Sequence, residues 1–292
     1  MKTSPSLNKI FHGPLEPLFS FLYITFVKVQ FLFFRVKWAF TDAPKTTDED
    51  AKNVADNVTF IYKSFERQSM AKRLYRNIQK MYPGANVIIA DDSKKPLKIS
   101  GDNVEIIHLP FNSGLSKGLN LALSKVKTPF TMRLDDDELL TPYSRIHEHL
   151  RFLQNHPEVD LVGILPYNAP FVKNPLTQTK FYFNESMSAA PIKLKIPHMT
   201  TIDENYVVLG KVPNIFLART KEYRAVGYDD NIRMIDHQEF FFRAAGKITS
   251  VLSLNSYVFH YHDRFNKYYD KFRADTYSDG VYIKSKYPQY FK

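Results

Sequence analysis

Short apolar runs alternate with helical segments between residues 58 and 138, and this alternation constrains the fold more than any other feature of the sequence. Four runs are typical of strands, and they lie at residues 58–62, 86–90, 104–109 and 128–132. Residues 68–82 place apolar side chains three and four positions apart, which is the spacing of an amphipathic helix. Strands that alternate with helices form a mostly parallel sheet with helices on both faces. The sequence therefore predicts an α/β fold.

Acidic residues follow two of these strands. Asp91 and Asp92 come after the second strand, and Asp135, Asp136 and Asp137 come after the fourth. Ligands bind at the carboxyl ends of the strands in such sheets, so both groups are expected at one edge. Side chains alternate along a strand, which predicts that Asp135 and Asp137 face the same way and share Mg²⁺ or Mn²⁺ with substrate phosphates. The simpler alternatives are a solvated acidic turn for the later group and a turn with a helix cap for the earlier one.

Composition narrows the partners and the compartment. The 292 residues carry a formal net charge of +10, which favours an anionic partner such as substrate phosphates, nucleic acid or an acidic membrane surface. The sequence contains no cysteine, which excludes disulfides and thiolate metal sites and favours a reducing, cytosolic setting.

Residues 18–40 are the most apolar part of the sequence. A single lysine, Lys28, interrupts the run, and Arg35, Lys37 and Trp38 near its end are typical of a membrane interface. Three arrangements fit this pattern: a helix lying on a membrane surface, a marginal membrane span, or a helix packed on the core of the protein.

The chain divides into three parts. Residues 1–57 comprise the apolar segment and a polar linker over 41–57, residues 58–262 form the α/β domain, and residues 263–292 are a basic and aromatic extension. The second half of the domain is less regular. Its expected elements are a helix at 144–155, a strand at 159–165, strands at 206–209 and 214–218 joined by a tight turn at 210–211, a helix at 236–245 and a strand at 257–260.

Residues 58–262 resemble the GT-A glycosyltransferases that use nucleotide-sugars, and in particular the β-1,4-N-acetylgalactosaminyltransferase type. The fragments that carry the likeness are, in order, residues 63–67 (KSFER), 82–83 (YP), 88–93 (IIADDS), 114–116 (GLS), 120–124 (NLALS), 135–137 (DDD), His237, 239–241 (EFF) and His260. The resemblance implies a Rossmann-like GT-A fold with a nucleotide-binding half at 58–140 and an acceptor half at 141–262. It also implies a UDP-sugar donor and Mn²⁺ or Mg²⁺.

The resemblance assigns roles to particular residues. Asp137 would bind the metal, Asp135 would reach the metal or the ribose, and His260, with His262 as the alternative, would complete the metal shell. The candidates for donor binding are Thr59, Arg67, Asp91, Asp92, Gly114, Lys117, Asn120, Asp135 and Asp136. Among them, Gly114 opens a helix whose N-terminus is expected to face the diphosphate, unless it is only a turn glycine.

Glu239 matches the position of the base that activates the acceptor hydroxyl. Without the resemblance, the favoured explanation is a glutamate exposed on a helix or paired with Arg243 four residues later. Asp236 is the second candidate base, and its alternative is a helix N-cap with Glu239 completing a capping box.

These observations predict an inverting, metal-dependent glycosyltransferase. It would move a sugar, such as an N-acetylhexosamine, from a UDP-sugar to a hydroxyl of a glycan or lipid-linked acceptor. We expect a cytoplasmic enzyme, peripheral at the inner face of a membrane through residues 18–40, with no nucleic-acid partner. The alternatives are a metal-dependent nucleotidyltransferase, disfavoured because residues 63–67 lack glycine, and a basic surface at 263–292 that binds nucleic acid or acidic lipid.

Overall fold

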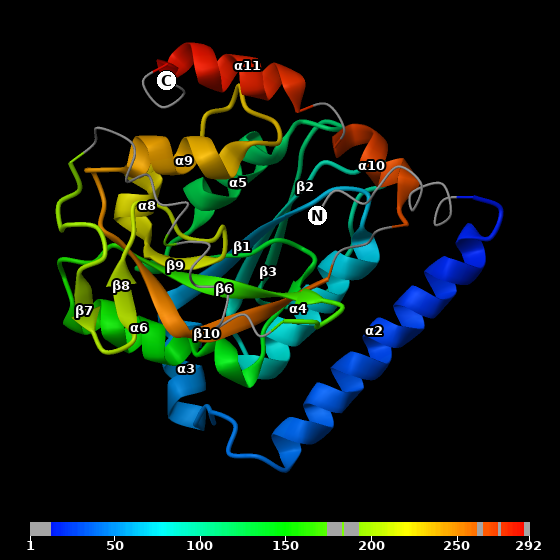
Figure 1. Cartoon of the computed structure of the whole chain (residues 1–292), viewed down its shortest axis with the longest axis horizontal. Helices are drawn as coiled ribbons and strands as arrows, with labels where there is room; N and C mark the ends of the chain where they lie inside the picture. Colours follow the sequence, from blue (N-terminus) through cyan, green and yellow to red (C-terminus); the bar gives the residue numbers. More distant parts are fainter. Residues whose placement is uncertain (1–12, 174–182, 184–192, 262–264, 274–275, 289–292) are drawn as a thin grey trace.

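One mixed sheet forms the centre of the molecule (Figure 1). The computed structural model describes residues 13–173, 183, 193–261, 265–273 and 276–288. Within these residues the strand order is β3-β2-β1-β4-β9-β6-β10-β8-β7, and β5 pairs with β10 outside this path. The predicted α/β fold is therefore confirmed.

The strands are β1 (Val58–Ser64), β2 (Asn86–Asp91), β3 (Val104–His108), β4 (Phe130–Arg133), β5 (Glu138–Leu139), β6 (Leu161–Ala169), β7 (Thr201–Asp203), β8 (Tyr206–Val208), β9 (Phe216–Arg219) and β10 (Ser250–Tyr261). The helices are α2 (Glu16–Ala39), α3 (Asp48–Asn57), α4 (Gln68–Met81), α5 (Leu115–Lys125), α6 (Ile146–Asn155), α8 (Thr220–Val226), α9 (Asp236–Ala244), α10 (Lys267–Arg273) and α11 (Tyr277–Lys286).

The two halves of the sheet are built differently. Strands β3, β2, β1 and β4 are parallel neighbours, as the alternation of strands and helices predicts. Strand β9 then runs antiparallel to both β4 and β6. The expected hairpin of β8 and β9 is wrong, because β8 pairs with β7 and β10 instead. Residues 210–215 connect the two strands across the sheet rather than through a tight turn.

Helices cover both faces of the sheet (Figure 1). Helix α4 shows why: Met70, Ala71, Leu74 and Ile78 form a buried stripe at helical spacing. Helices α3, α4 and α6 pack into the hydrophobic core on one face, and α5, α8 and α9 pack into the core on the other. The carboxyl ends of β1 and β4 remain accessible between these layers.

Residues 48–57, which were expected to belong to a linker, form helix α3. Thr47 caps the helix in a reciprocal capping box with Asp50. Val54 and Ala55 are buried in the core beneath the sheet. The polar composition of this segment is typical of a linker, yet the segment forms a short helix with one buried face.

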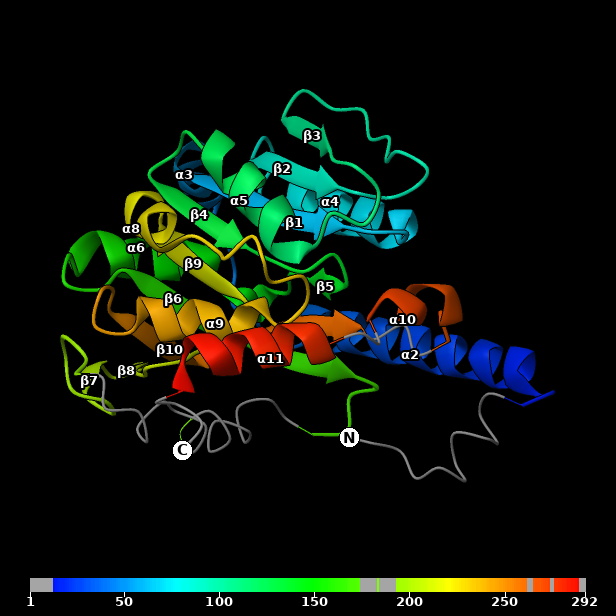
Figure 2. The same cartoon turned by 90° about the horizontal axis from the view of Figure 1, so that it is seen from above.

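Helix α2 lies along the outside of the domain (Figures 1 and 2). Phe34 and Trp38 contact Phe259 of β10, with ring centroids 5.4 and 5.2 Å apart, and Val27 is buried. Packing on the core of the protein, one of the three expected arrangements, therefore accounts for this face of the helix. The opposite face is exposed and apolar.

The extension after residue 262 contributes two helices to the domain. Helix α10 lies beside the first turns of α2, where Lys267 pairs with Glu16. Helix α11 lies over α9 (Figure 1), and Tyr287, directly after it, donates a hydrogen bond to Glu239.

Candidate active site

A cavity of about 450 Å³ opens at the carboxyl ends of the central strands. Its charged and polar lining comes from both halves of the sheet and from the C-terminal helices. The lining includes Lys63, Arg67, Asn112, Asp135, Asp136, Asp137, Asn214, Arg233, Asp236, His237, His260, Tyr269, Lys271 and Ser278. The cavity is large enough for a small-molecule ligand.

The three aspartates that follow β4 lie in a turn. The strand ends at Arg133, so the alternation of side chains expected for Asp135 and Asp137 does not apply. Asp135 pairs with Arg133 at 2.9 Å, whereas Asp136 and Asp137 both pair with Arg67. Asp135 therefore faces Arg133, whereas Asp136 and Asp137 face Arg67. All three aspartates line the cavity.

Arg67 neutralises two adjacent buried carboxylates. Its Nη1 donates to Asp137 Oδ2 at 2.8 Å, and its guanidinium lies 4.1 Å from the ring centroid of Tyr269. Burial raises the pKa of Asp136 to about 7 against the opposing charge of Arg67. Burial would also raise the pKa of Asp137, but His260 and Arg67 together hold it well below its usual value. Asp137 is thus the acid of this pair that stays ionised.

Asp137 and His260 lie next to each other in the wall of the cavity. Asp137 Oδ1 lies 3.7 Å from His260 Nε2, and His260 Nδ1 donates to Asn168 Oδ1 at 2.6 Å. The contact with Asn168 fixes the orientation of the imidazole ring, so that Nε2 is directed toward Asp137. A carboxylate oxygen and an imidazole nitrogen so placed fit a divalent cation. The described residues contain no group of three or more His, Cys, Asp or Glu side chains that could hold a metal ion, so a cation here would need oxygen ligands from its substrate.

Asp236, the first residue of α9, points into the same cavity. Its Oδ2 accepts a hydrogen bond from Asn214 Nδ2 at 3.2 Å and lies 3.7 Å from Arg133 Nη2. Burial raises the pKa of Asp236 to about 6, and Arg133 opposes this rise. A carboxyl group with this pKa can take up a proton near neutral pH.

Glu239 does not belong to the cavity wall. Its side chain is fully buried against the end of α11, and Oε1 accepts hydrogen bonds from Arg243 Nε at 2.7 Å and Tyr287 OH at 2.7 Å. Lys286 Nζ adds a third contact at 3.3 Å. The ion pair with Arg243, considered above as the alternative, is present, so the geometry gives Glu239 no access to an acceptor hydroxyl.

Other predicted donor-binding residues support the cavity from outside it. Asp91 accepts hydrogen bonds from Ser93 and from the Leu97 amide, and Asp92 holds Lys63 and the Gly114 amide. Only Gly114 of the predicted residues in this region lines the cavity itself. Asp92 therefore positions two residues that line the cavity without lining it itself.

Three predicted donor-binding residues lie away from the cavity. Thr59 lies at the opposite end of β1, where its hydroxyl meets that of Thr128. Asn120 bonds to the backbone of Tyr228, and Lys117 projects from α5 into solvent. All three lie close in sequence to residues that line the cavity. Thr59 is separated from the cavity because it lies near the start of β1, and Lys117 and Asn120 because they lie on α5 and do not face the cavity. His262 lies outside the described residues.

Sequence reasoning missed the aromatic border of the cavity. Phe272 of α10 contacts Phe65, which follows β1, with ring centroids 5.2 Å apart, and Phe111, which follows β3, at 5.6 Å. The interleaved aromatic and basic residues after 262 were the available signal. That composition did not reveal that α10 closes over the loops of the nucleotide-binding half.

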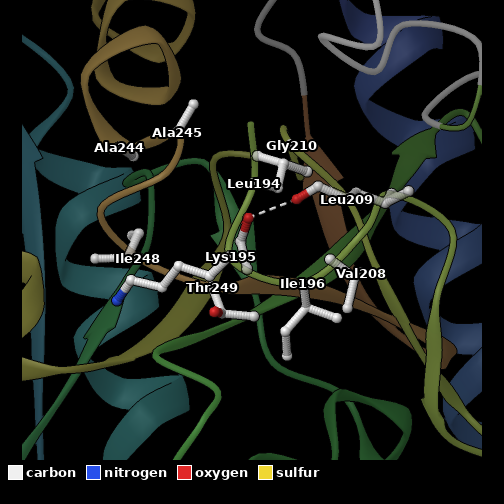
Figure 3. Close-up of a pocket in the computed structure, with 11 residues that line it drawn as sticks. Leu194, Lys195, Ile196, Val208, Leu209, Gly210, Ala244, Ala245, Ile248 and Thr249 are labelled. Atoms are coloured by element: carbon white, nitrogen blue, oxygen red, sulfur yellow. Dashed lines mark hydrogen bonds between the residues drawn. The ribbon is translucent and has the colours of Figure 1, made fainter. Parts of the chain in front are cut away.

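A second hollow, near the start of β10, is too small to be a site. It has a volume of about 10 Å³, and Ser250 Oγ donates to the Leu209 carbonyl oxygen beside it at 2.6 Å (Figure 3). This volume holds about one water molecule. The cavity with the acids is by far the larger of these two spaces.

Two solved structures illustrate this architecture. The fold is similar to that of S. aureus TarS in complex with UDP-GlcNAc, with a TM-score of 0.52, 16% sequence identity and coverage of 71% of this chain and 59% of TarS. It is also similar to the mannosyltransferase PcManGT from Pyrobaculum calidifontis in complex with GDP-Man and Mn²⁺, with a TM-score of 0.51, 13% identity and coverage of 87% and 72%. The sheet and its acidic edge thus define a GT-A-type domain.

Sequence comparison places this domain in a family. Residues 58–202 match the profile described as "Glycosyl transferase family 2". The chain is 32% identical to β-1,4 N-acetylgalactosaminyltransferase 2 of Mus musculus over 246 residues, which are 80% of this chain and 47% of that protein. It is 32% identical to β-1,4 N-acetylgalactosaminyltransferase 1 of Homo sapiens over 213 residues, 67% and 37% respectively. The chain belongs to glycosyltransferase family 2, and it spans about half or less of the length of the curated relatives it matches.

Proposed function

We propose that the chain is an inverting, metal-dependent glycosyltransferase that takes a sugar, such as an N-acetylhexosamine, from a UDP-sugar. The observation that carries the proposal is the arrangement of Asp137, His260 and Asp236 around one cavity. The names of the relatives and of the TarS complex support an N-acetylhexosamine and a uridine nucleotide. The acceptor would be a hydroxyl of a glycan or a lipid-linked glycan.

The donor would bind with its diphosphate beside Asp137 and His260. These two residues would hold Mn²⁺ or Mg²⁺, which when bound neutralises the charge of the departing diphosphate. Arg67 balances Asp136 and Asp137, so the acids do not repel the nucleotide as strongly as three bare carboxylates would. Lys63, buried against Asp92, adds a positive charge to the same wall.

Asp236 would remove the proton from the acceptor hydroxyl as the new bond forms. Asn214 and Arg133 hold its carboxylate, and its raised pKa favours proton uptake. Attack by the hydroxyl oxygen on the anomeric carbon breaks the bond to the diphosphate, which leaves with the bonding electrons. One such displacement inverts the anomeric centre, so an α-linked donor would give a β-glycoside.

A donor screen tests the proposal. The purified chain with Mn²⁺ would be offered UDP-GalNAc, UDP-GlcNAc, UDP-galactose, UDP-glucose and GDP-mannose, and slow release of the nucleotide would be measured with and without a chelator. We expect metal-dependent release from a UDP-N-acetylhexosamine, and NMR of a transfer product should show a β-linkage. Release that does not need the metal, or an α-linked product, would contradict the mechanism.

We further propose that α2 contacts a membrane surface. By length and composition it is the one helix among the described residues that could cross a membrane. Its outward face carries an apolar stripe, and the stripe residues, 48–65% exposed, are Leu18, Phe21, Leu22, Phe26, Val29, Leu32, Phe33 and Val36. Exposed Lys28, Arg35 and Lys37 are charge-complementary to an anionic bilayer. Because the opposite face packs on β10, peripheral contact fits this arrangement better than a span.

Vesicle sedimentation tests the membrane proposal. We expect the protein to pellet with vesicles that contain phosphatidylglycerol, and a Leu22→Gln, Val29→Gln, Phe33→Gln variant to remain in solution. Replacing Lys28, Arg35 and Lys37 by glutamine should remove the preference for anionic over neutral vesicles. If the wild type ignores vesicles and the stripe instead drives dimerisation in analytical ultracentrifugation, the membrane proposal fails.

A further inference from the structure

One buried carboxylate outside the cavity holds the backbone that leads into Asp236. Asp279, in the first turn of α11, is 3% exposed. Its Oδ2 accepts hydrogen bonds from the backbone N–H groups of Arg233, Met234 and Ile235 at 3.1, 2.6 and 3.1 Å. Three successive N–H groups that converge on one anion form a compact nest for negative charge. Here the anion is supplied by a side chain 44 to 46 positions further along the sequence.

This contact replaces a local helix cap. Ile235 is the N-cap residue of α9, and it has no side-chain atom that can accept a hydrogen bond. The first backbone N–H groups of a helix and those just before it need partners. Asp279 provides partners for the three residues that immediately precede Asp236, and its negative charge lies at the positive end of the α9 dipole.

The segment 233–235 also connects the two sides of the cavity. The carbonyl oxygen of Arg233 accepts a hydrogen bond from the Leu115 amide at 3.0 Å, and Arg233 Nη2 donates to the Asn112 carbonyl oxygen at 2.9 Å. Arg233, Leu115 and Asn112 all line the cavity. Movement of this segment would therefore shift both Asp236 and the loop that precedes α5.

Helix α11 is fixed strongly enough to serve as a support. Besides Asp279, Tyr282 donates to Asp229 at 2.9 Å, Lys286 pairs with Asp229, and Tyr287 and Lys286 both bond to Glu239. These contacts tie the helix to the loop before α9 and to α9 itself. Glu239 thus acquires a role that its motif position did not indicate, as an anchor for α11.

We infer that Asp279 is a positioning residue for the glycosyl transfer, acting through the backbone of 233–235 on the carboxylate of Asp236. This inference rests on the proposed function of Asp236. Asp279 touches neither donor nor acceptor, and it sets the position of the base relative to the metal-binding pair. The extension after residue 262 therefore contributes, through Asp279, to the geometry of the site.

The experiment combines kinetics with hydrogen exchange on the full chain. In Asp279→Ala the amides of residues 233–235 should exchange at least about tenfold faster, because each loses its acceptor. The value of kcat should fall by about 10- to 100-fold, since small displacements of a catalytic group have effects of this size. The Kd of UDP with Mn²⁺, measured by calorimetry, should change by less than about threefold, because Asp279 does not touch Asp137 or His260. Asp279→Asn keeps one acceptor oxygen and should restore part of kcat.

Tyr282→Phe is the matched control. It removes a hydrogen bond from the same helix without touching 233–235, so kcat and the exchange of those amides should stay near wild type. If Asp279→Ala exchanges as the wild type does, or keeps kcat within about twofold despite fast exchange, the inference is overturned. Should Asp279→Ala fail to fold, Asp279→Asn decides: loss of the charge should still speed exchange of these amides and lower kcat, by less than alanine would, and wild-type values of both would overturn the inference. The exchange measurement needs no substrate, so an inactive wild type would count against the proposed function and not against the contact itself.

Discussion

Helix α9 contributes carboxylates to two clusters of buried charge, Asp236 to one and Glu239 to the other, and the two carboxylates differ in what they can reach. The cavity cluster consists of Asp236 with Arg133 and the acids that follow β4, and it faces a volume of about 450 Å³. The Glu239 cluster consists of Glu239, Arg243, Lys286 and Tyr287, whose three contacts all go to Oε1 of the buried carboxylate. Burial and pairing alone do not make an acid catalytic. Access to a cavity separates a group available for chemistry from one that holds helices together.

Replacing the carboxylate of Asp236 should cause the largest loss of turnover among the variants of the two clusters. Asp236→Asn keeps the size of the side chain but cannot take up a proton, so kcat should fall by about 10²- to 10⁴-fold. UDP binding with Mn²⁺ should stay within a few-fold of wild type. Steady-state kinetics and calorimetry check both. Near-normal turnover in this variant would mean that the base has been misassigned.

Asp137→Ala should separate binding from proton transfer within the cavity cluster. Loss of a group that only orients a metal ligand typically costs 10- to 100-fold in metal affinity, so loss of a direct ligand should cost at least about 100-fold. The difference in UDP affinity with and without Mn²⁺ should disappear in calorimetry, while the thermal unfolding transition remains cooperative. An undiminished Mn²⁺ effect would remove Asp137 and His260 from the proposed metal site.

The pH dependence sharpens the comparison further. The base must be ionised to act, and the pKa of Asp236 is about 6, so kcat/KM should fall by about tenfold per pH unit below that value and level off above it. The pKa of Asp136 is raised to about 7, so the Asp236→Asn variant is the necessary control. The limb due to Asp236 should vanish from the residual activity of that variant. If the whole acid limb persists, another group controls it.

Glu239→Gln should have the smallest effect on turnover and a visible effect on stability. The neutral side chain leaves Arg243 and Lys286 with weaker partners, and both are partly exposed, so unfolding should become easier by about 1–3 kcal/mol. The value of kcat should change only a few-fold. Urea denaturation and transfer kinetics on the same samples test this. A large loss of kcat with unchanged stability would return Glu239 to the catalytic role.

Local patterns in the sequence predicted the parts of the fold that depend on neighbours along the chain. The periodicity of residues 68–82 and the acidic ends of the second and fourth strands predicted α4 and the edge where the cavity lies. The separation of β8 from β9 was not predictable in this way, because β8 pairs with β10 and β9 pairs with β4, both of which are remote in sequence. Composition also concealed α3, whose polar sequence is typical of a linker.

The sequence predicted which types of residue form the candidate site, but not which way their side chains point. Asp135 and Asp137 line the cavity as expected, but a turn, not a strand, sets their partners. Asp91 and Glu239 occupy the motif positions of functional residues, yet both carboxylates point into the protein. Which way a buried acid points depends on side chains such as Tyr287 that are remote in sequence.

The placement of Asp279 has a consequence for how the protein is made. Every strand of the sheet precedes α11 in the chain, so during synthesis the cavity is assembled from segments that leave the ribosome before Asp279 does. A nascent chain that has folded its sheet would still lack the anchor for residues 233–235. Competence for transfer would therefore come only after the sheet has formed, and chains that stop before Asp279 would be poor consumers of the sugar-nucleotide pool.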